Sequence, residues 1–476
     1  MGDSMKKMVA VVGGLAILSI GSYPLFGMMI EKELRHQVEA APKQYGMSLS
    51  IREYHRHWFY SQAKVVWEWH IPAHLTQNHL GQTVTVSPKD MVKEFDLDIL
   101  HGPVILKPTP FFGIGYAKTS IDWPLMNKSN GEERYDKASV YPKLELSLAT
   151  NFLLQTHWKT TISHFKLISQ DQTQQLLWDG MVFENLMDRT GKHLKGQADL
   201  TGFDLVKPDM QVNLKGAQSN YDFEREKEGL YVGHAQFDIH QLHMQNNNQQ
   251  VFDLEDLVFT TNTDLDNEEF TTQLVTHFDK LNIDSKPVGP FDIDLKIEKV
   301  NAQVLARINQ LFQQEQNASP SFRQKNMWSM LSNVPELLKY GMVMQINKLH
   351  VVFPNGFIDS HGTMDLPLDK SGQLNLQRLQ TVKGQLEVLI SKDLFKNWLI
   401  DLVQRQMLQE QLSLDPSASS TDIHEIAVSR TSKKLTDLEQ SGVLKAQSSE
   451  FLINIQFHDG QLTVNQLPFD PSWLMI

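Results

Sequence analysis

The chain contains no cysteine among its 476 residues. This absence excludes thiol catalysis, disulfide bonds, cysteine-ligated zinc and a lipid-modified N-terminal cysteine. Catalytic and cofactor motifs are missing too, because no G-x-S-x-G, no H-E-x-x-H and no phosphate-binding glycine loop occurs. We therefore expect a noncatalytic protein without cofactor or metal, whose fold is stabilised by packing rather than by disulfides.

An excess of positive charge is lacking as well. The formal net charge is −12 and the pI is near 5.8. No long basic cluster is present that would follow a phosphate backbone, so nucleic acid is excluded as a partner. Hydrophobic residues make up 41% of the chain and aromatic residues 9%, which is enough for packed cores and excludes a disordered chain.

Long hydrophobic runs are scarce, and residues 8–30 form the only one. These 23 uncharged residues would make a helix of about 34 Å, long enough to cross the hydrocarbon core of a bilayer. Lys6 and Lys7 precede the run, and lysines beside a first hydrophobic segment tend to stay in the cytoplasm. The sequence predicts a single-pass signal anchor at 1–30 and export of the rest of the chain.

A cleaved signal peptide is the alternative to this anchor. Ser19 and Gly21 are small residues at the right spacing for a cut before Ser22. The apolar run continues past that point to Ile30, which favours an uncleaved segment. Residues 31–46 keep apolar residues at helical spacing and predict a helical stalk.

From residue 47 onward, apolar and polar residues alternate in the way that is typical of half-buried strands. Asp96 and Asp98 fall between apolar residues of one such stretch, and Asp292 and Asp294 fall in the same way within another. Alternation predicts that these carboxylates lie on solvated strand faces rather than acting as a catalytic pair.

Residues 157–205 and 234–283 resemble each other at an offset of about 76 residues, and each reads as a short antiparallel meander. Pro-Asn-Gly at 354–356 and Asp-Gly at 459–460 predict tight hairpins. The fold class expected is mainly β (α+β): an N-terminal transmembrane helix, then an elongated, repetitive antiparallel β-sheet assembly with a few amphipathic helices.

Helices are predicted after the caps Asn301 and Ser391 and around 328–338, whereas 413–423 reads as a flexible loop. The expected domains are an anchor (1–30), a stalk (31–46), a β-rich repeat domain (47–300) and an α+β C-terminal domain (301–476).

One face of a long sheet would carry every second residue and would form either a sealed core or an apolar groove for lipid. Strand patterning does not distinguish the two. The candidate inward, lipid-binding residues are Val65, Trp67, Trp69, Val258, Leu274, Ile293 and Leu295.

Histidine gives two further candidates. His55, His57, His70, His74 and His79 lie close in sequence, but their spacing lacks the regularity of a metal site, and none is predicted. The tripeptide His101-Gly102-Pro103 follows a strand, and we interpret it as a turn held by a histidine hydrogen bond.

Four elements of the sequence resemble the YdgA-like family of bacterial envelope proteins. They are the run from Tyr54 through Arg56 and Trp58 to Ser61, the element Leu100-His101-Gly102-Pro103, the stretch from Gly289 to Ala302, and the closing segment Asp459–Asn465. The chain departs from the family pattern at His57, where Gly is usual, and at Gln466, where Gly commonly follows Asn.

This resemblance implies an inner-membrane protein anchored through residues 8–30, with most of the chain in the periplasm. The repetitive β layout is similar in style to AsmA-like proteins, which form lipid-handling grooves. The function expected is a noncatalytic scaffold or a conduit for a lipid or other amphiphile. The alternatives are a periplasmic hydrolase with a site near His101 and a module that binds envelope proteins.

Overall fold

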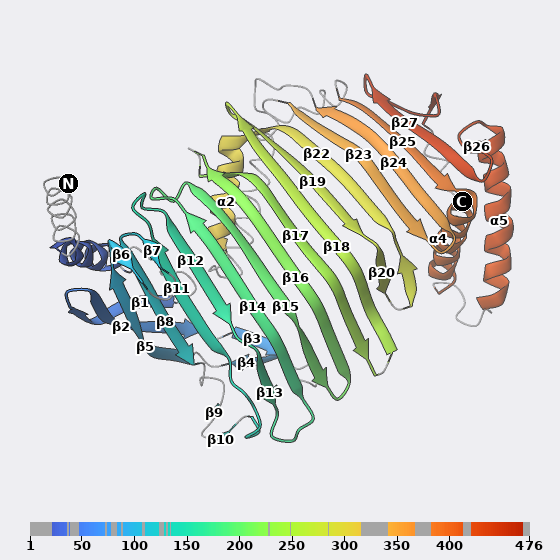
Figure 1. Ribbon diagram of the computed structural model, residues 1–476. Coiled ribbons are helices and arrows are strands. Elements are labelled where there is room, and N and C mark those ends of the chain that lie inside the picture. Colours follow the sequence, from blue (N-terminus) through green and yellow to red (C-terminus); the bar gives the residue numbers. More distant parts are fainter. Residues whose placement is uncertain are drawn as a thin grey trace, which may run out of the picture. The chain divides into compact units, whose positions relative to one another are not determined.

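The computed structural model describes residues 21–35, 38, 47–71, 74–77, 83–86, 89–106, 110–122, 128–129, 132–133, 135–226, 229–247, 249–283, 285–315, 341–366, 382–412 and 420–469. Figure 1 shows the helices and strands of these residues. The chain divides into two units. Unit 1 is Met1–Pro208 with Gln218–Arg225 and Phe312–Gln324. Unit 2 is Asp209–Ala217, Glu226–Leu311 and Lys325–Ile476. Both are mainly β, as the alternation predicted.

Unit 1 is an antiparallel sheet in which β1 pairs with β2, and β5, β8, β11, β12, β14 and β15 follow in that order. Its strands are β1 (Met47–Arg56), β2 (Tyr60–Ile71), β3 (His74–Gln77), β4 (Thr83–Val86), β5 (Lys89–His101), β6 (Val104–Ile105), β7 (Phe111–Phe112), β8 (Gly115–Asp122), β9 (Lys128–Ser129), β10 (Glu132–Glu133), β11 (Lys143–Thr150), β12 (Thr156–Ile162), β13 (Phe165–Ile168), β14 (Gln175–Met187) and β15 (His193–Lys207). The next strand, β16 (Met210–Arg225), is divided between the units.

A helix over residues 21–35 packs on one face of the unit 1 sheet. Ile30 and Leu34 contact a buried cluster on β2 and β5 that consists of Ala63, Val65, Leu97 and Ile99. Because apolar residues recur at three- and four-residue spacing in this segment, one side of the helix closes the core while the other stays exposed. The second half of the apolar run thus belongs to the folded unit.

The predicted anchor lies partly outside the described residues, since residues 1–20 are not among them. Within the part of the chain that the structure describes, no helix meets the length and hydropathy needed to cross a membrane. The helix does continue past residue 30, as expected for the join between run and stalk; residues 36–37 and 39–46 of the stalk lie outside the described ranges.

Unit 2 is also an antiparallel sheet, ordered β17, β18, β19, β22, β23, β24, β25, β27, β28 and β29. Its strands are β17 (Tyr231–Asn246), β18 (Gln249–Asp266), β19 (Glu269–Phe278), β20 (Lys280–Ile283), β21 (Lys286–Val288), β22 (Phe291–Asn301), β23 (Met342–Phe353), β24 (Gly356–Leu366), β25 (Lys383–Ser391), β26 (Lys445–Gln447), β27 (Glu450–His458), β28 (Gln461–Val464) and β29 (Leu467–Pro468).

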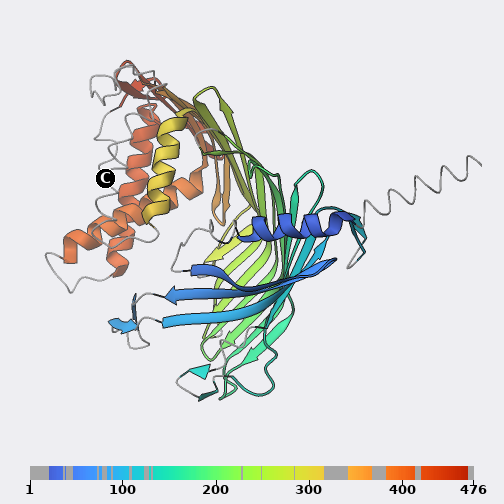
Figure 2. The same cartoon turned by 90° about the vertical axis from the view of Figure 1, so that its left-hand side faces the viewer.

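Three helices lie mostly or wholly in the described part of unit 2: α2 (Ala302–Glu315), whose last turn is assigned to unit 1, α4 (Lys392–Leu412) and α5 (Ser420–Gln440). Figure 2 shows them on the same side of the unit 2 strands. Asn301 caps α2 as predicted, because its Oδ1 accepts hydrogen bonds from the backbone N–H groups of Gln303 and Val304. The α4 helix begins directly after Ser391, although that hydroxyl accepts a hydrogen bond from the Phe357 N–H instead.

The predicted loop at 413–423 is wrong at its end, because α5 already begins at Ser420. Polar residues interrupt the apolar pattern of α5, so its sequence alone is a weak helix signal. Tertiary contacts stabilise the helix, because Ala427 is fully buried against Val403 of α4. The helix predicted at 328–338 lies outside the described residues.

Both hairpin predictions are confirmed. Phe353 pairs with Gly356 across a two-residue turn, and His458 pairs with Gln461 across Asp459-Gly460, whose φ angles of 52° and 75° are those of a primed turn. At the departure from the family pattern, Asn465 and Gln466 also have positive φ angles, 49° and 73°, so Gln466 adopts a conformation that favours glycine.

The two related segments form equivalent meanders, β13–β14–β15 and β17–β18–β19. Gly180 and Asp256, which the offset makes equivalent, both have positive φ. The predicted domain boundary at 300/301 falls within unit 2, because β22 pairs with β19 before it and with β23 after it. The strands before and after that position belong to the same sheet. Local sequence does not reveal this, because it depends on pairing between strands that are distant in the chain.

Candidate functional site

His101 lies at the end of β5 and is only 1% exposed. Its Nδ1–H donates to the backbone carbonyl of Trp58 at 3.3 Å, so Nε2 is free to accept the Ser61 hydroxyl proton at 2.8 Å. Burial lowers the pKa of His101, with the Trp58 carbonyl acting in the opposite direction. The imidazole is therefore neutral at physiological pH. Its side chain forms the hydrogen bond that the sequence suggested, but with the turn between β1 and β2 and with β2, rather than with its own His-Gly-Pro turn.

A serine hydroxyl bonded to a neutral histidine is also the beginning of a nucleophile-base pair. Ser61 is 0% exposed, however, and Gly27 of the helix over 21–35 lies against His101, so solvent does not reach either side chain. A β-carbon at Gly27 would lie 2.5 Å from His101 Cε1, so the helix backbone touches the imidazole ring. Sequence reasoning missed both Ser61 and Gly27, because only the fold brings them to His101.

The other residues of the motifs around His101 contribute mainly to turns and packing. At Gly102 a β-carbon would lie 1.8 Å from the Gly113 carbonyl oxygen, which no side chain permits. Pro103 accepts a hydrogen bond from the Gly113 N–H. Tyr54 packs in the unit 1 core, and Arg56 pairs with Glu31 of the helix at 3.1 Å. Trp58 is exposed in the turn between β1 and β2.

The seven predicted lipid-binding residues belong to both units, and those of unit 2 lie on two different faces of its sheet. In unit 1, Val65 is 5% exposed and sealed under Ile30 and Leu34. Trp67 and Trp69 lie further along the same face of β2, half-buried and stacked with their ring centroids 6.2 Å apart. In this unit the helix over 21–35 covers part of the face, which corresponds to the sealed core of the two alternatives that strand patterning left open.

In unit 2, pairing places Leu274, Ile293 and Leu295 on one face. Cross-strand partners extend two apolar rows from them: Leu274, Leu295, Ile346, Gly362, Leu386 and Ile455 form the first, and Thr276, Ile293, Leu349, Ser360, Val388 and Ile453 form the second. The side chains of the three predicted residues are half-buried. The α2 helix packs on Phe270 near one end of this face, and α4 packs on Ile390 and Phe451 near the other.

The prediction that Val258 shares this face is wrong. Val258 pairs with His277, which is three residues from Leu274 on β19, so the two side chains point to opposite sides of the sheet. A single odd step in register moves a residue to the other face, and this register depends on the long-range pairing of β18 with β19.

The face that carries Val258 is polar in the following strands. His277 lies 2.8 Å from Asp292 and 3.0 Å from Asp279, and Lys348 lies 2.9 Å from Asp292. Gln273 donates to Asp294 at 2.8 Å. In unit 1, Gln62 donates likewise to Asp98. The predicted aspartates thus lie on exposed or half-buried positions of their strands, and Asp98, Asp292 and Asp294 bond to residues of neighbouring strands rather than to each other.

The hydrogen bond to Asp292, assisted by Asp279, raises the pKa of His277 above its usual value. A raised pKa means that protonated His277 stabilises the fold below about pH 6.5 and that this contribution is lost as pH rises through the folded-state pKa. We expect the melting temperature of the native protein to fall toward that of His277→Gln between about pH 6 and 8. A difference between the two melting temperatures that stays constant with pH would contradict this.

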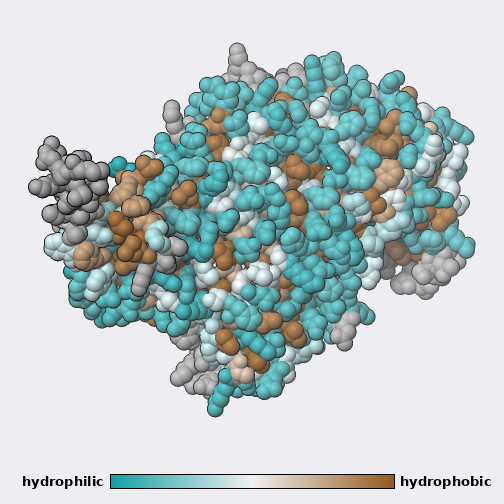
Figure 3. Space-filling view, in the orientation of Figure 1, coloured by the Kyte–Doolittle hydropathy of each residue, from teal (hydrophilic) through white to brown (hydrophobic). Residues whose placement is uncertain are grey.

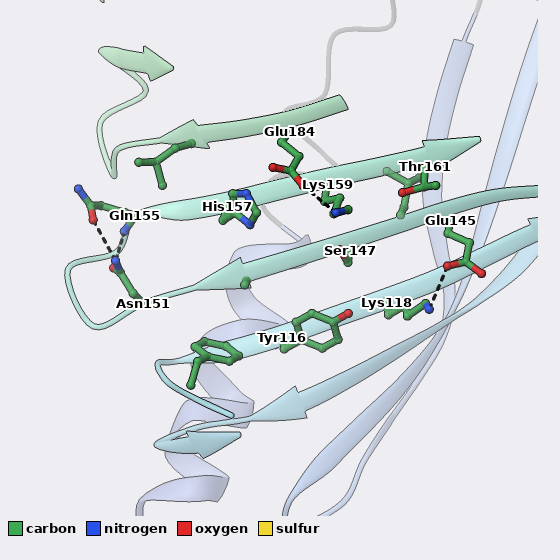
Figure 4. Close-up of a pocket in the computed structure, with 14 residues that line it drawn as sticks. Tyr116, Lys118, Glu145, Ser147, Asn151, Gln155, His157, Lys159, Thr161 and Glu184 are labelled. Carbon is green, nitrogen blue, oxygen red and sulfur yellow. Dashed lines mark hydrogen bonds and ion pairs between the residues drawn. The ribbon is translucent and has the colours of Figure 1, made fainter. Parts of the chain in front are cut away.

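A shallow pocket of about 610 Å³ lies on the polar face of unit 1 (Figure 4). Lys118 from β8 pairs with Glu145 at 3.1 Å, and Lys159 from β12 pairs with Glu184 at 2.7 Å. These lysines lower the pKa of both carboxyl groups. Both glutamates are therefore ionised at neutral pH, and neither is poised to donate a proton.

Across the described ranges, no group of three or more histidine, aspartate or glutamate side chains is arranged to hold a metal ion. His74 lies in β3, and His79 is outside the described residues. His57, at the other departure from the family pattern, stacks on Tyr60 with 4.5 Å between ring centroids.

Together these features define a mainly β protein whose unit 2 sheet has one polar and one apolar face. The chain belongs to a bacterial family of unknown function, because the model described as "Bacterial protein of unknown function (DUF945)" matches residues 5–472. No curated protein and no solved structure matches the chain.

Proposed function

We propose that this chain is a noncatalytic, membrane-tethered protein of the bacterial envelope that holds a lipid or other amphiphile on the apolar face of its unit 2 sheet. Membership of a bacterial family, the uncharged run at 8–30 and the lysines before it support a single inner-membrane anchor with most of the chain in the periplasm. The resemblance to YdgA-like envelope proteins agrees with this location.

The observation that carries the proposal is the pair of apolar rows in unit 2. Their central side chains, such as Ile293 and Leu295, stay half-buried while clusters toward the ends of the face are closed by helices. A face of this kind binds by displacing water from apolar surface, at about 25 cal/mol per Å². The two rows contain no charged side chain, and their polar members are two hydroxyl residues, Thr276 and Ser360. This composition fits an acyl chain better than a polar metabolite.

The register offers a matched pair of variants to test this. Ile293→Asp places a carboxylate on the apolar face, and Val258→Asp places the same carboxylate on the polar face of the same unit. Both positions are partly exposed, so water reaches the new charge and both variants should fold. We expect co-purified lipid, measured by native mass spectrometry of detergent-extracted protein, to fall several-fold in Ile293→Asp only.

Equal lipid content in both variants would contradict the proposal. Loss of the cooperative melt in Ile293→Asp would also contradict it, because that result means the face is a sealed core. The closed environment of His101 and Ser61 supports a noncatalytic role for that pair.

A further inference from the structure

Exposed apolar side chains gather at one end of unit 1, where three chain connections lie side by side. The backbone N–H of His101 donates to the Phe59 carbonyl at 2.9 Å, and that of Ile114 donates to the Thr150 carbonyl at 2.8 Å. These bonds join the β1–β2 turn, the β5–β8 connection and the β11–β12 turn. We call their exposed residues the apolar collar: Trp58, Phe59, Leu106, Phe112, Phe152 and Leu153.

The collar is unusually apolar for a set of loop tips. Phe112 is 72% exposed, Leu153 is 76% exposed, and the other four residues are each about half exposed or more. Figure 3 shows brown side chains gathered at this end of unit 1, where β6 and β7 lie. Contiguous exposed apolar surface on a folded protein marks a contact with another molecule or with a membrane.

The helix over 21–35 begins at the collar. Tyr23 packs edge-on against Phe59 with ring centroids 4.9 Å apart, and its hydroxyl donates to the Val104 carbonyl at 2.8 Å. Phe26 contacts Phe152 with 6.0 Å between ring centroids. The start of the helix therefore touches all three connections, and residues 8–20, which carry no charge, join the fold at this end.

The length of the uncharged segment before the helix indicates that the partner of the collar is a membrane. If this end of unit 1 stood away from the bilayer, residues 8–20 alone would have to cross it, and as a helix they reach only about 20 Å of a core that is about 30 Å thick. The outer side of the docked helix is itself apolar, with Leu25, Met28 and Met29 each about half exposed. Seating the collar at the lipid surface adds this part of the helix to the crossing and recovers the missing length.

We propose that the apolar collar inserts into the lipid interface and holds unit 1 directly on the membrane through which the chain is anchored. This rests on the membrane tether of the proposed function, but not on lipid binding by unit 2. Tryptophan and tyrosine are enriched at the interface of a bilayer, and Trp58 and Tyr23 take that position here.

The absence of native cysteine allows single-cysteine labelling without background. Phe112→Cys and Leu153→Cys place a nitroxide in the collar, and Asp122→Cys places one at the far end of β8, about 24 Å along the strand from Gly115. In the full chain reconstituted into liposomes of neutral and anionic phospholipid, we expect collisions with oxygen to exceed those with a water-soluble nickel chelate several-fold at 112 and 153. The reverse ratio is expected at 122.

Preferential collision with the nickel chelate at 112 and 153 would overturn the proposal. So would protection from both reagents, which would mean that protein covers the collar. Vesicle flotation is measured on the same samples. If the chain floats but the nitroxides at 112 and 153 are exposed to water, only the insertion of the collar is contradicted. If the chain does not float, the membrane tether is contradicted as well. Lipid content of the Ile293→Asp variant separately tests the unit 2 proposal.

Discussion

Ile99→Asp should abolish the stable fold of unit 1. Ile99 is 1% exposed and is surrounded by Ala63, Leu97 and the helix residues Ile30 and Leu34. The side chains of this cluster are hydrophobic, so a carboxylate there would be buried among apolar groups. Such a charge costs about 3–5 kcal/mol, which is a large fraction of the stability of an ordinary domain.

Hydrogen exchange read by mass spectrometry measures this effect segment by segment. We expect amides of β2, β5 and β8 to lose protection in Ile99→Asp. Val92→Asp is the matched control, because Val92 lies on the same strand but is 57% exposed, opposite Glu68. It should change stability by no more than about 1 kcal/mol. Full protection of β5 in Ile99→Asp would mean that water reaches this position and that the core assignment is wrong.

Gly27→Ala should loosen the helix over 21–35 from the sheet. The new methyl group would lie 2.5 Å from His101 Cε1 and 2.8 Å from Nδ1, on a ring held by two hydrogen bonds. Either the helix moves out or the bond between Ser61 and His101 breaks. Overpacking of this kind costs about 1–3 kcal/mol, which exceeds the gain of about 1 kcal/mol from replacing glycine by alanine within a helix.

Gly21→Ala is the matched control for Gly27→Ala. A β-carbon at Gly21 meets nothing within 4 Å, so this change should be neutral or slightly stabilising. The check is the exchange rate of the amides over 21–35 together with the thermal unfolding of the detergent-solubilised chain. If both variants behave alike, the helix is not docked on His101 in solution.

Much of the local structure follows from the sequence. Alternation identified the strands that carry Val65 and Leu97, because a half-buried strand needs an apolar residue at every second position. Asp459-Gly460 identified a hairpin because its turn requires positive φ angles, and Asn301 identified a helix start because its side chain satisfies free backbone N–H groups. Each of these sequence patterns reflects an interaction between residues that lie close together in the chain.

The candidate sites required the tertiary structure. The sequence selected His101 but not its partner Ser61, which lies 40 positions earlier and reaches it only because β2 pairs with β5. The helix α5 was missed because its buried side, including Ala427, is defined by contact with α4 rather than by its own pattern.

By itself the sequence determined that this is a β-rich chain without disulfides or known catalytic motifs, with one uncharged run near its start. Tertiary structure alone decided which face each strand residue occupies: it separated Val258 from Leu274, and it placed Val65 under the helix over 21–35. The physical reason is that alternation defines two faces for every strand, but only the register between distant strands decides which of them is covered.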